Sequence, residues 1–145
     1  MPVTTAPFAA LLIANRGEIA IRIARAASEL GIRSVAIYAE DDAASLHVRQ
    51  ADSAVALKGR GVAAYLDMDQ LIAIAQAEGC DAVHPGYGFL AENAEFARRC
   101  QAAGLCFVGP SAEVLQLFGD KAAARELAER CDVPLVAGIN RSISL

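Results

Sequence analysis

Apolar residues fall along the chain either in short continuous runs or at spacings of three and four residues. Short runs are typical of buried strands, and the spaced pattern is typical of amphipathic helices. The runs predict strands at Ala9–Ala14, Ser34–Tyr38, Ser53–Leu57, Cys80–His84 and Leu105–Val108, with an extended piece at Val133–Val136. The spaced stretches predict helices at Glu18–Leu30, Ser45–Gln50, Asp67–Glu78, Glu92–Ala103, Ser111–Phe118 and Asp120–Cys131.

Strands and helices alternate over short connections. This order predicts the α/β class, with a Rossmann-like open parallel sheet and helices on both faces. We predict that the Rossmann-like domain covers residues 1–110. Residues 111–145 are predicted to form a helical linker and the truncated start of another structural region. In such sheets, ligands bind beyond the carboxyl ends of the strands. Asn15–Glu18, Glu40–Asp42 and His84–Asn93 are therefore expected along one functional edge.

The composition narrows the function classes. The 145 residues are 55% hydrophobic and carry a formal charge of −4. That apolar content fits one folded domain, and the scattered charges argue against nucleic-acid partners and anionic membranes. No apolar run reaches the ~18–20 residues of a membrane span, and the first residues do not follow a signal-peptide pattern. We expect a cytoplasmic protein.

The cysteine pattern argues against a metal centre. The chain has four cysteines without a C-x-x-C pair, and its two histidines are His47 and His84. We therefore expect reduced, mostly buried thiols and no metal site. The cysteines are Cys80, Cys100, Cys106 and Cys131.

Dinucleotide binding is the first function to consider, because many Rossmann-like domains bind dinucleotides. The fingerprint needs several glycines at the first strand-to-helix turn, yet Asn15–Glu18 contains one glycine and an acidic side chain. The acidic cluster Glu40–Asp42 resembles a ribose-binding acid, but without the glycines it is interpreted as a solvated turn. A looser glycine match at Gly86, Gly88 and Ala91 has no acid behind it.

The densest candidate segment is His84–Asn93. Its two glycines would let backbone approach a ligand, Tyr87 offers an amphipathic ring, and a helix N-terminus follows. A tight strand-to-helix turn explains the same residues equally well. A histidine at a strand end, such as His84, is more typical of a hydrogen-bonded structural residue than of a catalyst.

Charged side chains on two helices offer further candidates. Lys121 lies in the first turn of a predicted helix, where the helix dipole disfavours a cation, which suggests that it neutralises a phosphate. An ordinary exposed lysine is the competing interpretation. On the first helix, charged pairs at i,i+4 lie opposite an Ile19–Ile23–Leu30 stripe, forming either a solvated face or a polar subunit interface. The pairs are Glu18–Arg22 and Arg25–Glu29. Because no catalytic triad or carboxylate pair emerges, the residues alone define a domain with a ligand-facing edge.

Three ordered segments resemble the biotin carboxylase family. They are Ile13–Ala20 (IANRGEIA), His84–Asn93 (HPGYGFLAEN) and Phe107–Pro110 (FVGP) followed by Gly119–Lys121 (GDK). The resemblance extends from about Leu11 to Gly138. The family includes the biotin carboxylase parts of acetyl-CoA, propionyl-CoA, pyruvate and urea carboxylases.

The resemblance implies an ATP-dependent ligase. Bicarbonate is activated by ATP as carboxyphosphate, with Mg²⁺ or Mn²⁺ on the nucleotide, and the carboxyl group passes to N1 of biotin. It further implies that Lys121 contacts the ATP phosphates and that Tyr87 and Gly88 lie beside biotin. The expected partners are a biotin carboxyl carrier domain, a carboxyltransferase component and a second copy in a homodimer. The implied dimer-interface residues are Arg22, Arg25 and Glu29.

One small departure from the family pattern is Ala91, where serine is common. The larger one is that the glycine-rich lid, the metal-binding glutamates and the catalytic acid–base follow later in the family. We therefore expect residues 111–145 to begin an ATP-grasp region, with no catalytic residue within this chain and no carboxylase activity from it alone. The alternatives are another ATP-grasp ligase, such as carbamoyl-phosphate synthetase, and a non-catalytic assembly module. The final carboxyl acceptor is specified by the carboxyltransferase component.

Overall fold

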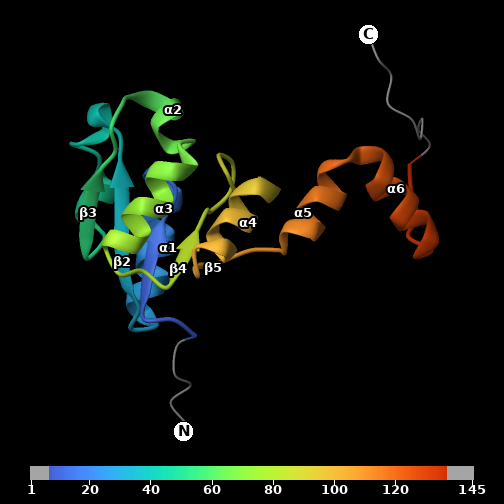
Figure 1. Cartoon of the computed structure of the whole chain (residues 1–145), viewed down its shortest axis with the longest axis horizontal. Coiled ribbons are helices and arrows are strands. Elements are labelled where there is room, and N and C mark those ends of the chain that lie inside the picture. The colour runs from blue at the N-terminus through green and yellow to red at the C-terminus, as the bar shows by residue number, and fades with distance from the viewer. Residues whose placement is uncertain (1–6, 137–145) are drawn as a thin grey trace, which may run out of the picture.

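A computed structural model describes residues 7–136 of the chain. Its centre is a five-stranded parallel sheet in the order β3-β2-β1-β4-β5 (Figure 1). The strands are β1 (Ala10–Ile13), β2 (Arg33–Tyr38), β3 (Ser53–Ala56), β4 (Ala82–His84) and β5 (Cys106–Phe107). The helices are α1 (Gly17–Glu29), α2 (Gly61–Tyr65), α3 (Met68–Ala77), α4 (Ala94–Ala102), α5 (Ala112–Gly119) and α6 (Lys121–Arg130), with 3₁₀ turns at Glu40–Asp42 and Leu46–Arg49. The predicted α/β class is confirmed.

The strand order reverses between β1 and β4. From β1 the chain adds β2 and β3 on one side and then returns to add β4 and β5 on the other. Ile13 is paired with His84, and the Ala14 N–H donates to the His84 carbonyl over 2.9 Å. The turns after β1 and β4 therefore emerge side by side at the carboxyl edge, which is where ligands bind in open α/β sheets.

Alternating side chains of the sheet fill two separate apolar layers, as the pleat requires. On one face, residues such as Leu12 and Val83 pack with Tyr65 of α2, Leu71 of α3 and Phe96 of α4. On the opposite face, β-strand side chains pack against α1. Helices thus cover both faces, as predicted.

The buried face of α1 differs from the predicted Ile19–Ile23–Leu30 stripe. The buried residues of the helix are Ala20, Ala24 and Ala27. Leu30, which is 67% exposed, lies at the C-cap beyond the last turn. Small side chains let the helix axis approach the sheet closely, so the isoleucines lie at the flanks of the contact and are half-buried.

One local prediction needs correction. The Gly61–Tyr65 segment, which follows the predicted Lys58–Gly61 turn, forms the short helix α2 that sequence periodicity did not indicate. A helix of five residues is too short to show a helical period in the sequence. Val133–Val136, predicted as an extended piece, belongs to no helix or strand of the structure, which does not contradict the prediction.

The last two helices extend away from the sheet (Figure 1). Their predicted caps are confirmed: the Ser111 hydroxyl accepts from the Val114 N–H, and the Asp120 carboxylate accepts from the Ala122 N–H. Apolar side chains such as Phe118 are exposed on α5. Within residues 7–136, no helix has the length and apolarity to cross a membrane.

Candidate functional site

Asn15 joins the two turns at the switch point. This side chain is 1% exposed, and its Nδ2 donates to the Pro85 carbonyl over 2.7 Å and to the Tyr87 carbonyl over 3.0 Å. Its Oδ1 accepts from the Arg16 N–H over 2.8 Å. The Asn15 amide therefore ties the loop after β4 to the loop after β1, although the two are about 70 residues apart.

Two glycines in the loop after β4 have positive φ angles and different surroundings. A Cβ on Gly86 (φ +67°) would lie 2.6 Å from Ile19 Cγ2 and 2.8 Å from Asn15 Nδ2. A Cβ on Gly88 (φ +71°) would meet nothing within 4 Å. Gly86 is thus needed for close packing, whereas Gly88 leaves open space beside the backbone.

The side chains that follow these glycines point in different directions. Tyr87 is 64% exposed. Phe89 has φ +42°, which is unusual for a residue with a side chain, and its ring stacks on Tyr65 at a centroid distance of 5.3 Å. The loop therefore presents Tyr87 to solvent while Phe89 anchors it to α2.

Asp42 overturns the prediction of a solvated acidic turn. It is 7% exposed, and its carboxylate accepts from Arg16 Nη2 over 2.7 Å, from Tyr65 OH over 2.7 Å and from Ser45 Oγ over 3.1 Å. Burial alone would raise the pKa of Asp42, but the hydrogen bonds from Tyr65, Arg16 and Ser45 outweigh it and hold that pKa below its ordinary value. Burial and the hydrogen bond to Asp42 raise the pKa of Tyr65, so the phenol stays protonated.

The other two acids of this turn are exposed, as predicted. Glu40 accepts from the Gly59 N–H over 3.3 Å, and Asp41 accepts from the Gly61 N–H over 2.9 Å. Both acids therefore hold the loop between β3 and α2.

His84 makes a hydrogen bond of the kind expected for a structural residue at a strand end. Its Nδ1 accepts from the Gly86 N–H over 3.0 Å. Burial lowers the pKa of His84, so the ring is neutral near pH 7. A neutral ring can accept this hydrogen bond and helps to shape the turn.

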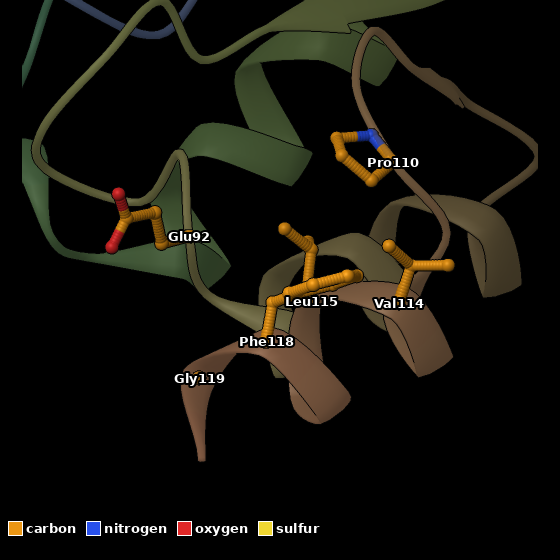
Figure 2. A pocket seen from close by; sticks show the side chains of 6 residues that line it. All are labelled: Glu92, Pro110, Val114, Leu115, Phe118 and Gly119. Atoms are coloured by element: carbon orange, nitrogen blue, oxygen red, sulfur yellow. The ribbon is translucent and has the colours of Figure 1, made fainter. Parts of the chain in front are cut away.

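Lys121 begins α6, which lies beyond α5 from the sheet (Figure 1). Its side chain is exposed and forms no ion pair with any residue from 7 to 136. Between the loop after β4 and α5 lies a largely apolar pocket of about 430 Å³ (Figure 2). Its lining residues are Glu92, Pro110, Val114, Leu115, Phe118 and Gly119.

The predicted interface residues lie exposed on α1. They are Arg22, Arg25 and Glu29. Glu18 and Arg22 form an exposed ion pair with an Oε1–Nη1 distance of 3.7 Å. The second predicted pair, Arg25–Glu29, does not form in the described part of the chain. Arg25 and Glu29 therefore do not neutralise one another across the helix surface.

All four cysteines are free, and the prediction that they are mostly buried is right for two of them. Burial raises the pKa of Cys80 and of Cys100 to about 11. Cys106 and Cys131 are exposed. No group of three or more His, Cys, Asp or Glu side chains suited to a metal occurs within residues 7–136.

The topology and the loops at its switch point define a Rossmann-like α/β domain with a ligand-facing edge. Residues 7–115 match the family model described as "Biotin carboxylase, N-terminal domain". The chain belongs to this family, which confirms the resemblance shown by the three sequence motifs.

Relatives and solved structures agree with this assignment. The chain is 56% identical to a putative urea carboxylase of Emericella nidulans and 53% identical to the pyruvate carboxylase of Bacillus subtilis, over 88% of its length in both cases. It also matches a solved biotin carboxylase domain from a single-chain bacterial carboxylase with 60% identity and a TM-score of 0.88. The match covers 92% of this chain and 32% of the solved one. The chain spans about a tenth of the curated relatives, namely 10% and 11% of those two proteins.

Proposed function

We propose that the chain serves an ATP-dependent biotin carboxylase, which transfers a carboxyl group from bicarbonate to carrier-bound biotin. The structural observation that supports this is a loop fixed at the switch point, with Tyr87 exposed and open space at Gly88. The 2-oxoglutarate carboxylase of Hydrogenobacter thermophilus, whose biotin carboxylase domain dimer was solved with MgADP and bicarbonate, is 46% identical with a TM-score of 0.89 over 92% of the chain.

The described residues fit part of the ligand set. Tyr87 and Gly88 would border biotin, because both offer unoccupied surface at the carboxyl edge. Lys121 would neutralise an ATP phosphate, which explains an exposed cation in the first turn of a helix. Mg²⁺ or Mn²⁺ on the nucleotide would be held mainly by other parts of the carboxylase, as the family resemblance implies.

We further propose how the chain is organised and where it works. Residues 1–110 form the Rossmann-like domain, and residues 111–145 lead into an ATP-grasp region. A carrier domain and a carboxyltransferase component are the proposed partners. The proposed compartment is the cytoplasm, which agrees with four unpaired cysteines.

A chimeric carboxylase tests the proposal. This chain replaces the matching segment of the biotin carboxylase domain that is 60% identical to it. We expect the folded chimera to cleave ATP in the presence of bicarbonate and to do so faster when free biotin is added. A folded chimera whose ATP cleavage is indifferent to biotin would overturn the assignment and favour another ATP-grasp ligase.

Lys121→Ala in this chimera is expected to lower kcat/KM for ATP about 10- to 100-fold, because a hydrogen bond to a charged phosphate is lost. Steady-state kinetics with varied ATP measure the change. Arg130→Ala, at the opposite end of α6, is the matched control and should have little effect. Equal kinetics for Lys121→Ala and the parent would return Lys121 to the role of a surface residue.

Arg25→Glu in the chimera is expected to shift a dimer toward monomer. A reversed charge facing a complementary partner surface costs several kcal/mol, so the dimer dissociation constant should rise at least about tenfold. Light scattering over a concentration series measures this. Lys58→Glu makes the same change in charge near the edge strand β3 and should leave the dimer intact. An unchanged dimer with Arg25→Glu would show that this face of α1 is solvated.

A further inference from the structure

We propose that Asn15 is a positioning residue that holds the Pro85–Phe89 loop in its ligand-binding shape. This rests on the proposed function, because it assigns biotin to the exposed face of Tyr87 and Gly88. Asn15 itself is buried and lies behind the loop, so it acts through the loop backbone.

The Asn15 side chain makes nearly all the hydrogen bonds that an amide can make. Both Nδ2 protons are donated to carbonyls of the same loop, at Pro85 and Tyr87, and Oδ1 accepts from the Arg16 N–H. The two carbonyls lie on either side of Gly86, whose backbone runs against the Asn15 side chain. An amide is required, because a carboxylate would turn a second oxygen toward these carbonyls.

A second anchor lies on the other side of Tyr87. Phe89 keeps a positive φ of +42° and stacks on Tyr65 with the ring planes within 1° of parallel. Such a backbone conformation persists only where the surroundings determine it. Tyr65 is itself fixed, since its hydroxyl donates to Asp42 and accepts from the Ala39 N–H over 3.1 Å.

Tyr87 thus lies between two anchors without being buried. Burial of its own ring cannot determine the conformation of the loop, because that ring is largely in solvent. The shape is set from behind, by Asn15 on one side and the Tyr65–Phe89 stack on the other. A loop that is ordered before the ligand arrives avoids the entropy loss of ordering it on binding, which is the advantage of preorganisation.

The test compares Asn15→Asp with the parent chimeric carboxylase. We call the hydrogen bonds from Asn15 to the Pro85 and Tyr87 carbonyls the clamp. Losing the clamp should raise KM for free biotin about tenfold or more, while KM for ATP stays within about twofold. Ser34→Ala is the matched control: Ser34 is also 1% exposed and hydrogen-bonded, to Asp52, but it lies at the amino end of β2. It is expected to lower Tm without changing KM for biotin.

Hydrogen exchange on the 145-residue chain gives an independent readout. Amides of the Gly86–Leu90 segment should exchange faster in Asn15→Asp than in the parent, with no such change in Ser34→Ala. If Asn15→Asp does not fold, Phe89→Leu removes the other anchor and should change biotin KM and exchange in the same direction.

Two outcomes would overturn the inference. One is an unchanged KM for biotin in a folded Asn15→Asp chimera, and the other is a parallel rise in KM for biotin and ATP, which indicates general damage. If the parent chimera shows no stimulation by biotin, the proposed function fails and the biotin role of Asn15 fails with it. Exchange in the loop then decides whether the clamp itself exists.

Discussion

Gly86→Ala is expected to lower the free energy of unfolding by about 2–5 kcal/mol. Forcing a side chain into the left-handed region at φ +67° costs about 1–2 kcal/mol. The added methyl group would also lie within 3 Å of Ile19 Cγ2 and Asn15 Nδ2. Relieving such overpacking costs typically about 1–3 kcal/mol. Urea unfolding of the 145-residue chain, followed by circular dichroism, measures the loss.

Gly88→Ala is the control for this experiment. Its φ of +71° is nearly the same as that of Gly86, but no atom lies within 4 Å of the added methyl group. Only the conformational cost of about 1–2 kcal/mol is therefore expected. The difference between the two variants isolates the contact with Asn15 and Ile19. Equal losses would mean that Gly86 is present for its backbone conformation alone and that the loop does not pack tightly on the first turn.

Much of the fold is predictable, because short stretches of sequence determine where its strands lie and where its helices begin. Apolar runs located all five strands, and Asp67, Asn93, Ser111 and Asp120 each cap a helix at or near the predicted start. The buried face of α1 cannot be predicted from the sequence of the helix alone. Whether Leu30 or a set of alanines faces the sheet depends on how closely the helix approaches it, which the helical period alone does not specify.

The neighbouring positions of the loops at the candidate site were predictable, but the contacts within it were not. Topology places the turns after β1 and β4 together, and the sequence named both of them. The sequence missed Asn15 as a clamp and Asp42 as a buried hub, because their partners lie 72 and 26 residues away along the chain. An asparagine immediately after a buried strand is the available signal, since a buried amide must find hydrogen-bond partners.

Asp42→Asn is expected to lower the free energy of unfolding by about 3 kcal/mol at pH 7. The buried Asp42 carboxylate accepts from the buried Tyr65 hydroxyl and from Arg16 and Ser45, which are partly exposed. An asparagine offers one oxygen, so one of these donors meets an NH₂ group and is left without an acceptor. Breaking a fully buried ion pair costs about 3–5 kcal/mol. The loss here is at the lower end of that range, because the Arg16 side chain is 45% exposed and the amide keeps part of the hydrogen bonding.

The difference between wild type and Asp42→Asn should depend on pH in one direction. Because the folded protein holds the pKa of Asp42 below its ordinary value, ionised Asp42 stabilises the fold above the unfolded pKa of about 3.9. This contribution is lost as the pH falls from about 5 through the folded pKa, whereas the amide of the variant does not titrate. Other acids with lowered pKa values, such as Asp41 and Asp52, are common to both proteins and cancel in the difference.

Urea unfolding of both proteins between pH 7 and pH 3 measures this difference. The gap should be widest at neutral pH and should narrow below about pH 4. Asp41→Asn, at the exposed neighbouring carboxylate, is the control: this side chain accepts one hydrogen bond, from the Gly61 N–H, so its gap should have the same direction but be much smaller. A gap that stays constant down to pH 3 would show that Asp42 contributes through its shape and not through its charge. In that case Arg16 and Tyr65 would be held by packing, and the hub behind the Phe89 anchor would not be electrostatic.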